Sequence, residues 1–323
     1  MKKIKLDLFE LKAKEDLVKS YRLFKEITKK WFDKKNLPKK DYFKDINCIL
    51  CNAKERELLF KLDNFSYQKC LKCDSIYTSP HPRESLLNDF YCNGEYEQYQ
   101  DKLVYKSSRI RKDILEERKY KQIKKITKDR SVSILDVGCG NGSFLDICKK
   151  NGWEVEGVDP SANQKKMTDV KRSFKIHQAS FSDINFSKKF DVISFWGVLE
   201  HLANPIQALE KAKSILKNNG IIVFEVPSAD CFLRYYLEKY QFEATRYIES
   251  GRHNIFFSKK IIYKIINDFG FTIKDIESNG LDIQTILLDS FDSDTTKKII
   301  DMQDVINDLM LGDHYRVFLS KGK

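Results

Sequence analysis

The chain has 323 residues, of which 41% are hydrophobic and 33% are charged, and its formal net charge is +11. This length and apolar content predict a globular protein with one large domain and a smaller unit. No run approaches the roughly 18 uninterrupted apolar residues of a membrane helix, and the opening residues lack the apolar core of a secretory signal. We therefore expect a cytoplasmic protein whose eight cysteines serve as metal ligands or buried thiols rather than disulfides. The positive charge fits either a solvated surface or an anionic partner.

Residues 1–44 are expected to form a helical N-terminal segment. Apolar side chains recur at helical spacing from Leu17 to Trp31, which predicts an amphipathic helix packed against another element. A lysine-rich stretch containing Pro38 follows and is typical of a linker.

Residues 45–82 contain four cysteines in two matched pairs. Cys48 and Cys51 form one C-x-x-C turn, and Cys70 and Cys73 form another after an 18-residue spacer. Each turn can offer two thiolates to one side of a tetrahedral metal ion, and this spacing of the cysteines is typical of a zinc site. The alternative to a zinc site is four reduced cysteines in the core of a small subdomain. Four thiolates leave no open coordination position, so we expect a structural zinc ion.

A helical connector is expected at residues 83–130, followed by a larger domain at residues 131–323. Short apolar runs alternate there with helical segments. The expected strands are SVSILDVG, WEVEGVDP, FDVISFW, GIIVFEVP, FTIKDIES and HYRVFLSK. The alternation predicts an α/β fold with a Rossmann-like, doubly wound, mainly parallel sheet, which residues 228–257 interrupt as an insertion.

A glycine-rich turn follows the first strand of this domain. It reads Asp136-Val-Gly138-Cys-Gly140-Asn-Gly142 and precedes a helical segment. Glycines permit positive φ angles and let a ligand approach the backbone closely. The second strand ends in Asp159, where an acid can accept hydrogen bonds from ribose hydroxyls. Together these features predict a nucleotide-type cofactor site.

The segments LDVGCGNGSFL, GVDPS and FDVISFWGVLEHLANP resemble the class I S-adenosylmethionine-dependent methyltransferases. The resemblance covers about residues 131–320. It implies that Gly138, Gly140 and Gly142 line the methionine and ribose part of the cofactor and that Asp159 holds the ribose. It further implies that Asp136 tunes the loop or reaches the methionine amino group.

The same resemblance implies cofactor contacts after the third and fourth strands. QASFSDINF matches the stretch that borders adenine, which points to Ser180, Phe181 and Asp183, although the usual acidic-alanine pair is absent. Phe195 and Trp196 fall where such enzymes border the sulfonium, and an aromatic ring attracts a cation. Trp196 is equally a candidate core aromatic.

Methyl transfer to a hydroxyl requires removal of its proton, and two residues are candidates for the base. Glu225 in FEVPS and His253 in GRHNIFFS follow strands, where a doubly wound sheet places its ligands. His253 could instead pack beside its phenylalanine neighbours. Glu200 and His201 belong to the methyltransferase signature, and His201 is expected to be structural.

The four-cysteine module, followed by TSPHPRES and NDFYCNGEYEQY, resembles the front part of bacterial methyltransferases associated with sugar or surface polysaccharide modification. This resemblance implies a sugar or nucleotide-linked sugar as acceptor. Related C-methyltransferases carry a Tyr-His-Glu-His tetrad, whereas this chain has a single histidine in the stretch from Ile248 to His253. This difference argues against methylation of carbon, and methylation of oxygen is favoured. Arg234, Arg246 and Arg252 of the insertion are candidates for pairing with a phosphate.

Two alternatives remain open. A zinc knuckle and a charge of +11 also fit an RNA methyltransferase acting on tRNA, although WGVLEH differs from the Asn-Pro-Pro-Tyr loop of many base methyltransferases. A non-catalytic protein that kept the fold is the other alternative, against which the intact glycines and Asp159 argue.

Overall fold

The structure is a computed structural model. It describes residues 14–93, 99, 111–128, 130–161, 173–240, 247–248, 250–287 and 293–322. Arg246 lies outside the described residues, as do parts of the N-terminal segment and of the helical connector.

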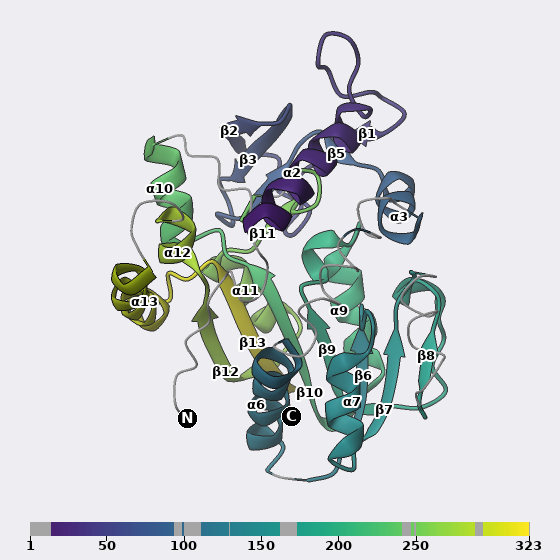
Figure 1. The fold of residues 1–323 in the computed structure, drawn as a ribbon. Coiled ribbons are helices and arrows are strands. Elements are labelled where there is room, and N and C mark those ends of the chain that lie inside the picture. The colour runs from purple at the N-terminus through teal and green to yellow at the C-terminus, as the bar shows by residue number, and fades with distance from the viewer. Residues whose placement is uncertain are drawn as a thin grey trace.

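A seven-stranded sheet lies at the centre of the described chain (Figure 1). Its order is β12-β13-β10-β9-β6-β7-β8. The strands are β6 (Ser133–Val137), β7 (Glu154–Val158), β8 (Lys175–His177), β9 (Phe190–Trp196), β10 (Leu216–Pro227), β12 (Phe271–Asn279) and β13 (His314–Lys321). Neighbouring strands from β8 to β10 run parallel, and β13 runs antiparallel to both β10 and β12. The predicted mainly parallel α/β fold is confirmed.

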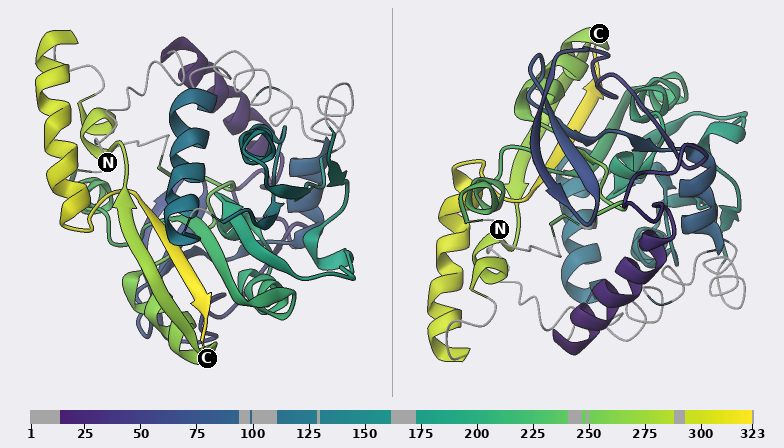
Figure 2. Two further views of the ribbon diagram at one scale, coloured as in Figure 1. Left: turned by 90° about the horizontal axis from the view of Figure 1, so that it is seen from below. Right: turned by 90° about the horizontal axis from the view of Figure 1, so that it is seen from above.

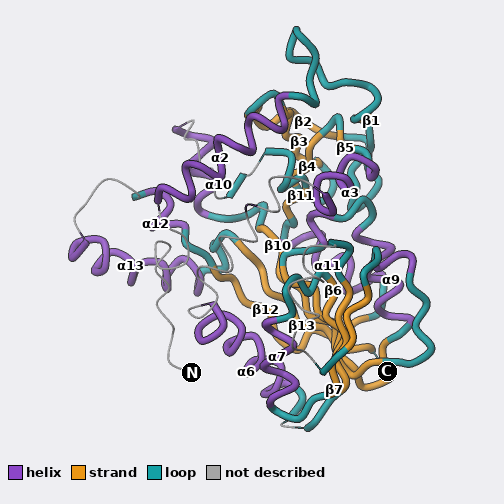
Figure 3. Tube along the Cα trace, turned by 45° about the vertical axis from the view of Figure 1, so that its right-hand side comes forward, coloured by secondary structure: helices purple, strands orange, loops and turns teal. Residues whose placement is uncertain are grey.

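Helices cover both faces of this sheet because its central strands bury alternate side chains on opposite sides. Figure 3 shows the helices flanking the strands. The covering helices are α6 (Glu117–Ile126), α7 (Ser143–Lys150), α9 (Pro205–Ser214) and α11 (Lys259–Asp268). Ile134 of β6 shares a core cluster with α6 and α7, whereas its neighbour Leu135 shares one with α9 and α11.

A smaller antiparallel sheet contains the cysteine turns. It has the order β11-β4-β3-β2, with β2 (Arg56–Leu62), β3 (Phe65–Cys70), β4 (Ile76–Thr78) and β11 (Ile255–Phe256). β1 (Phe43–Lys44) pairs separately with β5 (His81–Pro82). Because β11 comes from the segment expected to be an insertion, that segment completes the sheet of the cysteine module. The sequence patterns had not predicted this pairing.

The cysteine module and α2 (Lys14–Lys29) lie over the central sheet when the molecule is seen from above (Figure 2, right). Phe24 of α2 lies 5.8 Å from Phe90 of α3 (Glu84–Asn93), and the Trp31 ring, just after α2, lies 6.2 Å from Phe65 of β3. The other described helical elements are η1 (Arg111–Glu116), η2 (Phe181–Asp183), η3 (Leu199–His201), α10 (Phe232–Tyr240), α12 (Asp282–Ile286) and α13 (Ser293–Asp308). Among the described residues, no helix is long and apolar enough to cross a membrane.

Candidate functional site

The glycine-rich turn joins β6 to α7 and follows the carboxyl end of β6. Gly138, Gly140 and Gly142 have φ angles of 69°, 52° and 73°, in the left-handed region that favours glycine. A Cβ on Gly138 would lie 2.4 Å from Cγ2 of Val198, in the turn after β9. The glycine turn therefore lies directly against the turn that carries the methyltransferase signature.

Asp159 follows β7 and holds the glycine turn from the side. Its two carboxylate oxygens accept backbone N–H bonds from Gly140 and Ser161, each at 2.9 Å. Burial raises the pKa of Asp159, and these two bonds oppose that shift. Each oxygen has a second lone pair, so the carboxylate can also accept hydrogen bonds from a ligand.

Asp136 is buried at the carboxyl half of β6. Burial raises its pKa to about 7, and Ser194 of β9 donates a hydrogen bond to it at 2.6 Å. Lys119 of α6 supplies a positive charge that favours the ionised form. Asp136 thus lies at the base of the glycine turn as a titratable group with a perturbed pKa, which is typical of a functional site.

The residues expected near adenine lie in η2. Phe181 is buried, and its ring centroid lies 5.7 Å from that of Phe195, which is itself a core residue. The hydroxyl of Ser182 lies 2.8 Å from that of Ser180 and donates to Asp183 at 2.9 Å. The assignment of Ser180, Phe181 and Asp183 to adenine remains a prediction.

Trp196 begins a row of side chains that crosses four strands. Trp196 of β9 pairs in register with Glu225 of β10, which pairs with Arg316 of β13, which in turn pairs with Glu277 of β12. Arg316 donates to Glu225 at 2.9 Å and to Glu277 at 3.1 Å. Its guanidinium carbon lies 5.2 Å from the centre of the Trp196 ring, and Nζ of Lys119 lies 4.9 Å from that ring. Two protein cations therefore already contact the ring that we expect near the sulfonium.

This row determines the basicity of Glu225. Burial raises its pKa, but the charges of Arg316, His314 and Lys119 outweigh burial and bring the pKa down to about 2. A carboxylate with so low a pKa is a weak proton acceptor at neutral pH. The ion pair thus favours a positioning role for Glu225 over the base role expected from its place after β10. Arg316 was not singled out in the sequence, since one arginine within HYRVFLSK gives no signal of its partners.

A second cluster brings Glu200, His201 and His253 together. Glu200 and His201 lie in η3, directly after β9, whereas His253 precedes β11. Oε1 of Glu200 lies 3.8 Å from Nε2 of His201, and the two imidazole centroids are 5.5 Å apart. His253 Nδ1 lies 2.8 Å from the carbonyl oxygen of Tyr247, and His201 Nδ1 lies 2.9 Å from that of Arg252. The histidine expected to be structural and the one expected to be catalytic are therefore neighbours.

The four cysteines of the front module converge. The sulfur of Cys48 lies 3.6 Å from that of Cys73, and the sulfur of Cys51 lies 3.5 Å from that of Cys70. All four sulfurs lie within 4.8 Å of one another. A tetrahedral ion with Zn–S bonds of about 2.3 Å separates its sulfurs by about 3.8 Å, so the arrangement fits zinc.

The arginines of the segment 228–257 differ in their surroundings. Arg234 pairs with Glu238 at 2.5 Å and stacks on the ring of Tyr235 at 3.7 Å, and its side chain is buried. This arrangement favours a structural role for Arg234 over the expected contact with phosphate. The backbone carbonyl of Arg252 accepts hydrogen bonds from His201 and Tyr91.

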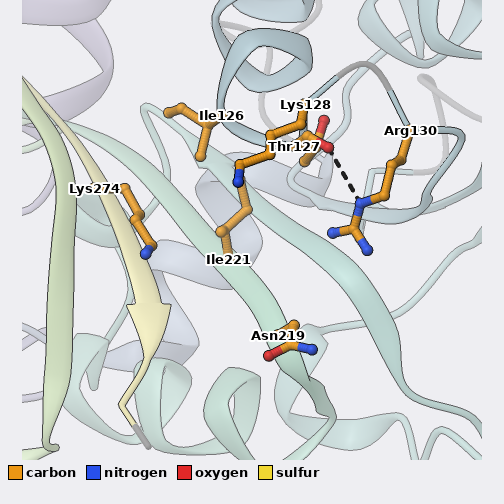
Figure 4. Close-up of a pocket in the computed structure, with 7 residues that line it drawn as sticks. All are labelled: Ile126, Thr127, Lys128, Arg130, Asn219, Ile221 and Lys274. Carbon is orange, nitrogen blue, oxygen red and sulfur yellow. Dashed lines mark hydrogen bonds between the residues drawn. The ribbon is translucent and has the colours of Figure 1, made fainter.

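A pocket elsewhere in the molecule is shown in Figure 4. It lies between the end of α6 and the amino-terminal parts of β10 and β12, and Lys128, Arg130 and Lys274 are among its lining residues. Doubly wound sheets bind their ligands at the carboxyl ends of the strands. This pocket is therefore separate from the glycine turn.

Comparison with known proteins agrees with this geometry. Residues 102–276, more than half of the chain, match the family model described as a methyltransferase domain. A ubiquinone biosynthesis O-methyltransferase of Actinobacillus pleuropneumoniae is 28% identical over 102 residues, which cover 28% of this chain and 44% of that protein. A tRNA U34 carboxymethyltransferase of Campylobacter jejuni subsp. doylei is 29% identical over 99 residues, covering 28% and 34%. The chain thus spans less than half the length of these curated relatives.

Solved structures share the fold. The plantazolicin methyltransferase BpumL in complex with SAH aligns with a TM-score of 0.52 and 15% identity, covering 73% of this chain and 94% of that one. The family match confirms the expected methyltransferase domain. The chain belongs to the methyltransferase-domain family.

Proposed function

We propose that this methyltransferase acts on a hydroxyl oxygen of a small polar acceptor, a sugar or a nucleotide-linked sugar. The observation that carries the proposal is the cluster of Glu200, His201 and His253 in and beside the turn after β9. This turn contacts the glycine turn through Val198. An oxygen acceptor needs a group that removes its proton, and the cluster supplies proton-accepting atoms near the cofactor loop.

His253 is the proposed base. Its Nδ1 faces a backbone carbonyl, which only accepts hydrogen bonds, so the proton of the neutral ring sits on Nδ1 and the lone pair on Nε2. As the acceptor oxygen attacks the methyl carbon, its proton passes to Nε2 of His253. The carbon–sulfur bond breaks and its electron pair stays on sulfur, which leaves S-adenosylhomocysteine. Glu225 is paired with Arg316 and holds β10 against β13, and it does not accept the proton.

The proposed cofactor contacts keep the roles inferred above. Asp159 accepts from the ribose hydroxyls, the three glycines admit the methionine part, and Asp136 lies beneath them. Ser180, Phe181 and Asp183 border the adenine, and Trp196 borders the sulfonium. The four cysteines hold a structural zinc ion, which fixes the module on which β11 is built.

The test is a methylation assay in which purified protein and labelled S-adenosylmethionine are offered nucleotide sugars, free sugars, phenolic acceptors and total tRNA. We expect transfer to a sugar hydroxyl, with at least a tenfold lower kcat for His253→Ala, since general acid-base catalysis contributes roughly 10²–10⁴-fold. The control is His177→Ala, on β8, where the ring pairs with Glu156. Transfer to a nitrogen or carbon atom would refute the proposal.

The net charge of +11 and the tRNA-modifying relative favour tRNA as the second candidate acceptor. Methylation of tRNA that falls steeply with salt, together with no transfer to sugars, would establish it, because that slope reports phosphate contacts along a polymer.

A further inference from the structure

We infer that Glu200, His201 and His253 form a binding site for a divalent metal ion, separate from the four-cysteine site. One ligand atom from each residue lies within 4.8 Å of the other two. Glu200 and His201 are adjacent in η3, and His253 reaches them from the segment before β11. The three residues thus converge through the tertiary fold, which is how most metal sites outside short motifs are assembled.

The hydrogen bonds of the two histidines prepare them as ligands. Each Nδ1 lies beside a backbone carbonyl oxygen, at 2.8 Å for His253 and at 2.9 Å for His201. A carbonyl oxygen can only accept, and the Tyr91 hydroxyl, 2.9 Å from Nδ1 of His201, gives its own proton to the carbonyl of Arg252. Each Nδ1 therefore carries the ring proton and each Nε2 carries a lone pair. Metal-bound histidines show this same arrangement, in which the second ring nitrogen donates to a carbonyl or a carboxylate.

Glu200 supplies the observation that calls for a ligand. The residue is 2% exposed, and its Oε2 atom has no hydrogen-bond partner among the described residues. Burying a carboxylate without compensation is costly, and buried charges are normally paired or bound to metals. Oε1 faces Nε2 of His201, which is itself an acceptor in this tautomer. A cation among these atoms would give Oε2 of Glu200 a partner.

The ligand set indicates which metals fit. Two imidazole nitrogens and one carboxylate suit Mn²⁺, Fe²⁺, Co²⁺ or Zn²⁺, whereas a set of thiolates selects zinc and other soft ions. Three protein ligands also leave coordination positions open for a further oxygen, in contrast to the closed four-cysteine site.

The location gives the ion a role that rests on the proposed function. Oε1 of Glu200 is 3.6 Å from where a Cβ of Gly197 would lie, and Gly197 directly follows β9. Val198, the next residue, contacts the glycine turn of the cofactor site. The open positions would therefore bind the acceptor oxygen, and the ion would lower the pKa of that hydroxyl. In this metal-bound form His253 would be a ligand and the acidified hydroxyl would lose its proton to water, so the base role proposed for His253 applies to the metal-free site.

The test measures Mn²⁺ binding by electron paramagnetic resonance and calorimetry in the absence of any acceptor. Protein already loaded with zinc is used, because thiolates then no longer compete. We expect a single Mn²⁺ per chain, and at least tenfold weaker binding in Glu200→Gln and in His253→Ala. Loss of an outer-shell partner alone costs about 10–100-fold in affinity, and these residues are direct ligands. The control His177→Ala should bind as wild type does.

Glu200→Gln preserves the shape of the side chain, so it keeps the test valid if His253→Ala does not fold. An unchanged affinity of folded Glu200→Gln for Mn²⁺ would overturn the inference. So would the absence of any Mn²⁺, Fe²⁺, Co²⁺ or Zn²⁺ bound outside the four-cysteine site. The three residues would then share a proton in place of a metal ion. Methyl transfer is assayed on the same samples. Transfer at an unchanged rate without this second metal would refute the role of the ion in methyl transfer, whereas metal binding without transfer to any hydroxyl would refute the proposed function.

Discussion

At the scale of single residues, Asp159 links the glycine turn to the residues after β7 in the proposed cofactor site. Its carboxylate fixes the backbone of Gly140 while retaining lone pairs for a ligand. Removing it would take away hydrogen bonds to the cofactor and loosen the turn at the same time. Both effects would weaken cofactor binding. The substitution leaves the central core of the sheet unchanged, so the protein should still fold.

We expect Asp159→Ala to weaken S-adenosylmethionine binding by about 1–3 kcal/mol, the cost of lost charge-assisted hydrogen bonds in a buried site. Calorimetric titration measures this change. Glu154→Ala is a matched control, because Glu154 is on the same strand but is exposed and pairs with Lys188. Equal affinities of folded Asp159→Ala and wild type would remove the ribose assignment.

At the scale of secondary-structure elements, the row from Trp196 to Glu277 connects β9, β10, β13 and β12 through one buried arginine. Gln122 of α6 joins this row by accepting a hydrogen bond from Arg316 at 2.5 Å. Ion pairs of this kind contribute to stability mainly because loss of one partner leaves a buried charge without compensation. The row therefore ties β12, β13 and α6 to the strands that carry the proposed cofactor site.

The low pKa of Glu225 predicts a pH dependence of stability. Its folded-state pKa of about 2 lies below its ordinary value of 4.5, so its contribution is present above pH 4.5 and is lost as the pH falls toward 2. We expect wild type to lose about 1–3 kcal/mol more unfolding free energy than Glu225→Gln over this interval. Urea unfolding of both proteins at several pH values measures the difference. Parallel losses would show that Glu225 gains nothing from Arg316.

At the scale of the whole molecule, the cysteine module and residues 254–258 form one unit. β11 pairs with β4, and the Ser258 hydroxyl donates to the carbonyl of Cys73. Asn254 accepts a hydrogen bond from Thr78 at 3.2 Å. His253 is therefore held between the module and the central sheet, so the proposed zinc site supports the acceptor side of the active site.

We expect Cys48→Ser/Cys70→Ser to lose the bound zinc and to increase amide hydrogen exchange in residues 253–258, while exchange in β6 and β9 stays slow. The expected reason is that β11 loses the strand on which it pairs. Metal analysis and exchange mass spectrometry test both parts, with Cys148→Ser as the control, because Cys148 is buried in α7 away from the module. Full zinc content in the double variant would exclude these ligands.

The sequence by itself determined the elements and the class of enzyme. Apolar runs alternating with helical segments predict a parallel sheet with helices on both faces. The glycine turn and Asp159 form a pattern that can be recognised in a single sequence. The paired C-x-x-C turns also carry their own spacing. These signals are short-range, because strand, turn and helix formation depend on neighbouring residues.

The tertiary structure alone decided which distant groups meet. Nothing in the local sequence pairs Glu225 with Arg316, since strand register across β10 and β13 sets that contact. Likewise, Glu200 and His253 meet only because β11 joins the cysteine module beside η3. Side-chain chemistry follows from such neighbours. The carboxylate of Glu225 is a weak base because it lies beside Arg316, whereas the carboxylate of Glu200, beside two histidines, has one oxygen without a hydrogen-bond partner among the described residues. A residue's chemistry thus depends on long-range packing, which one sequence does not encode in any local pattern.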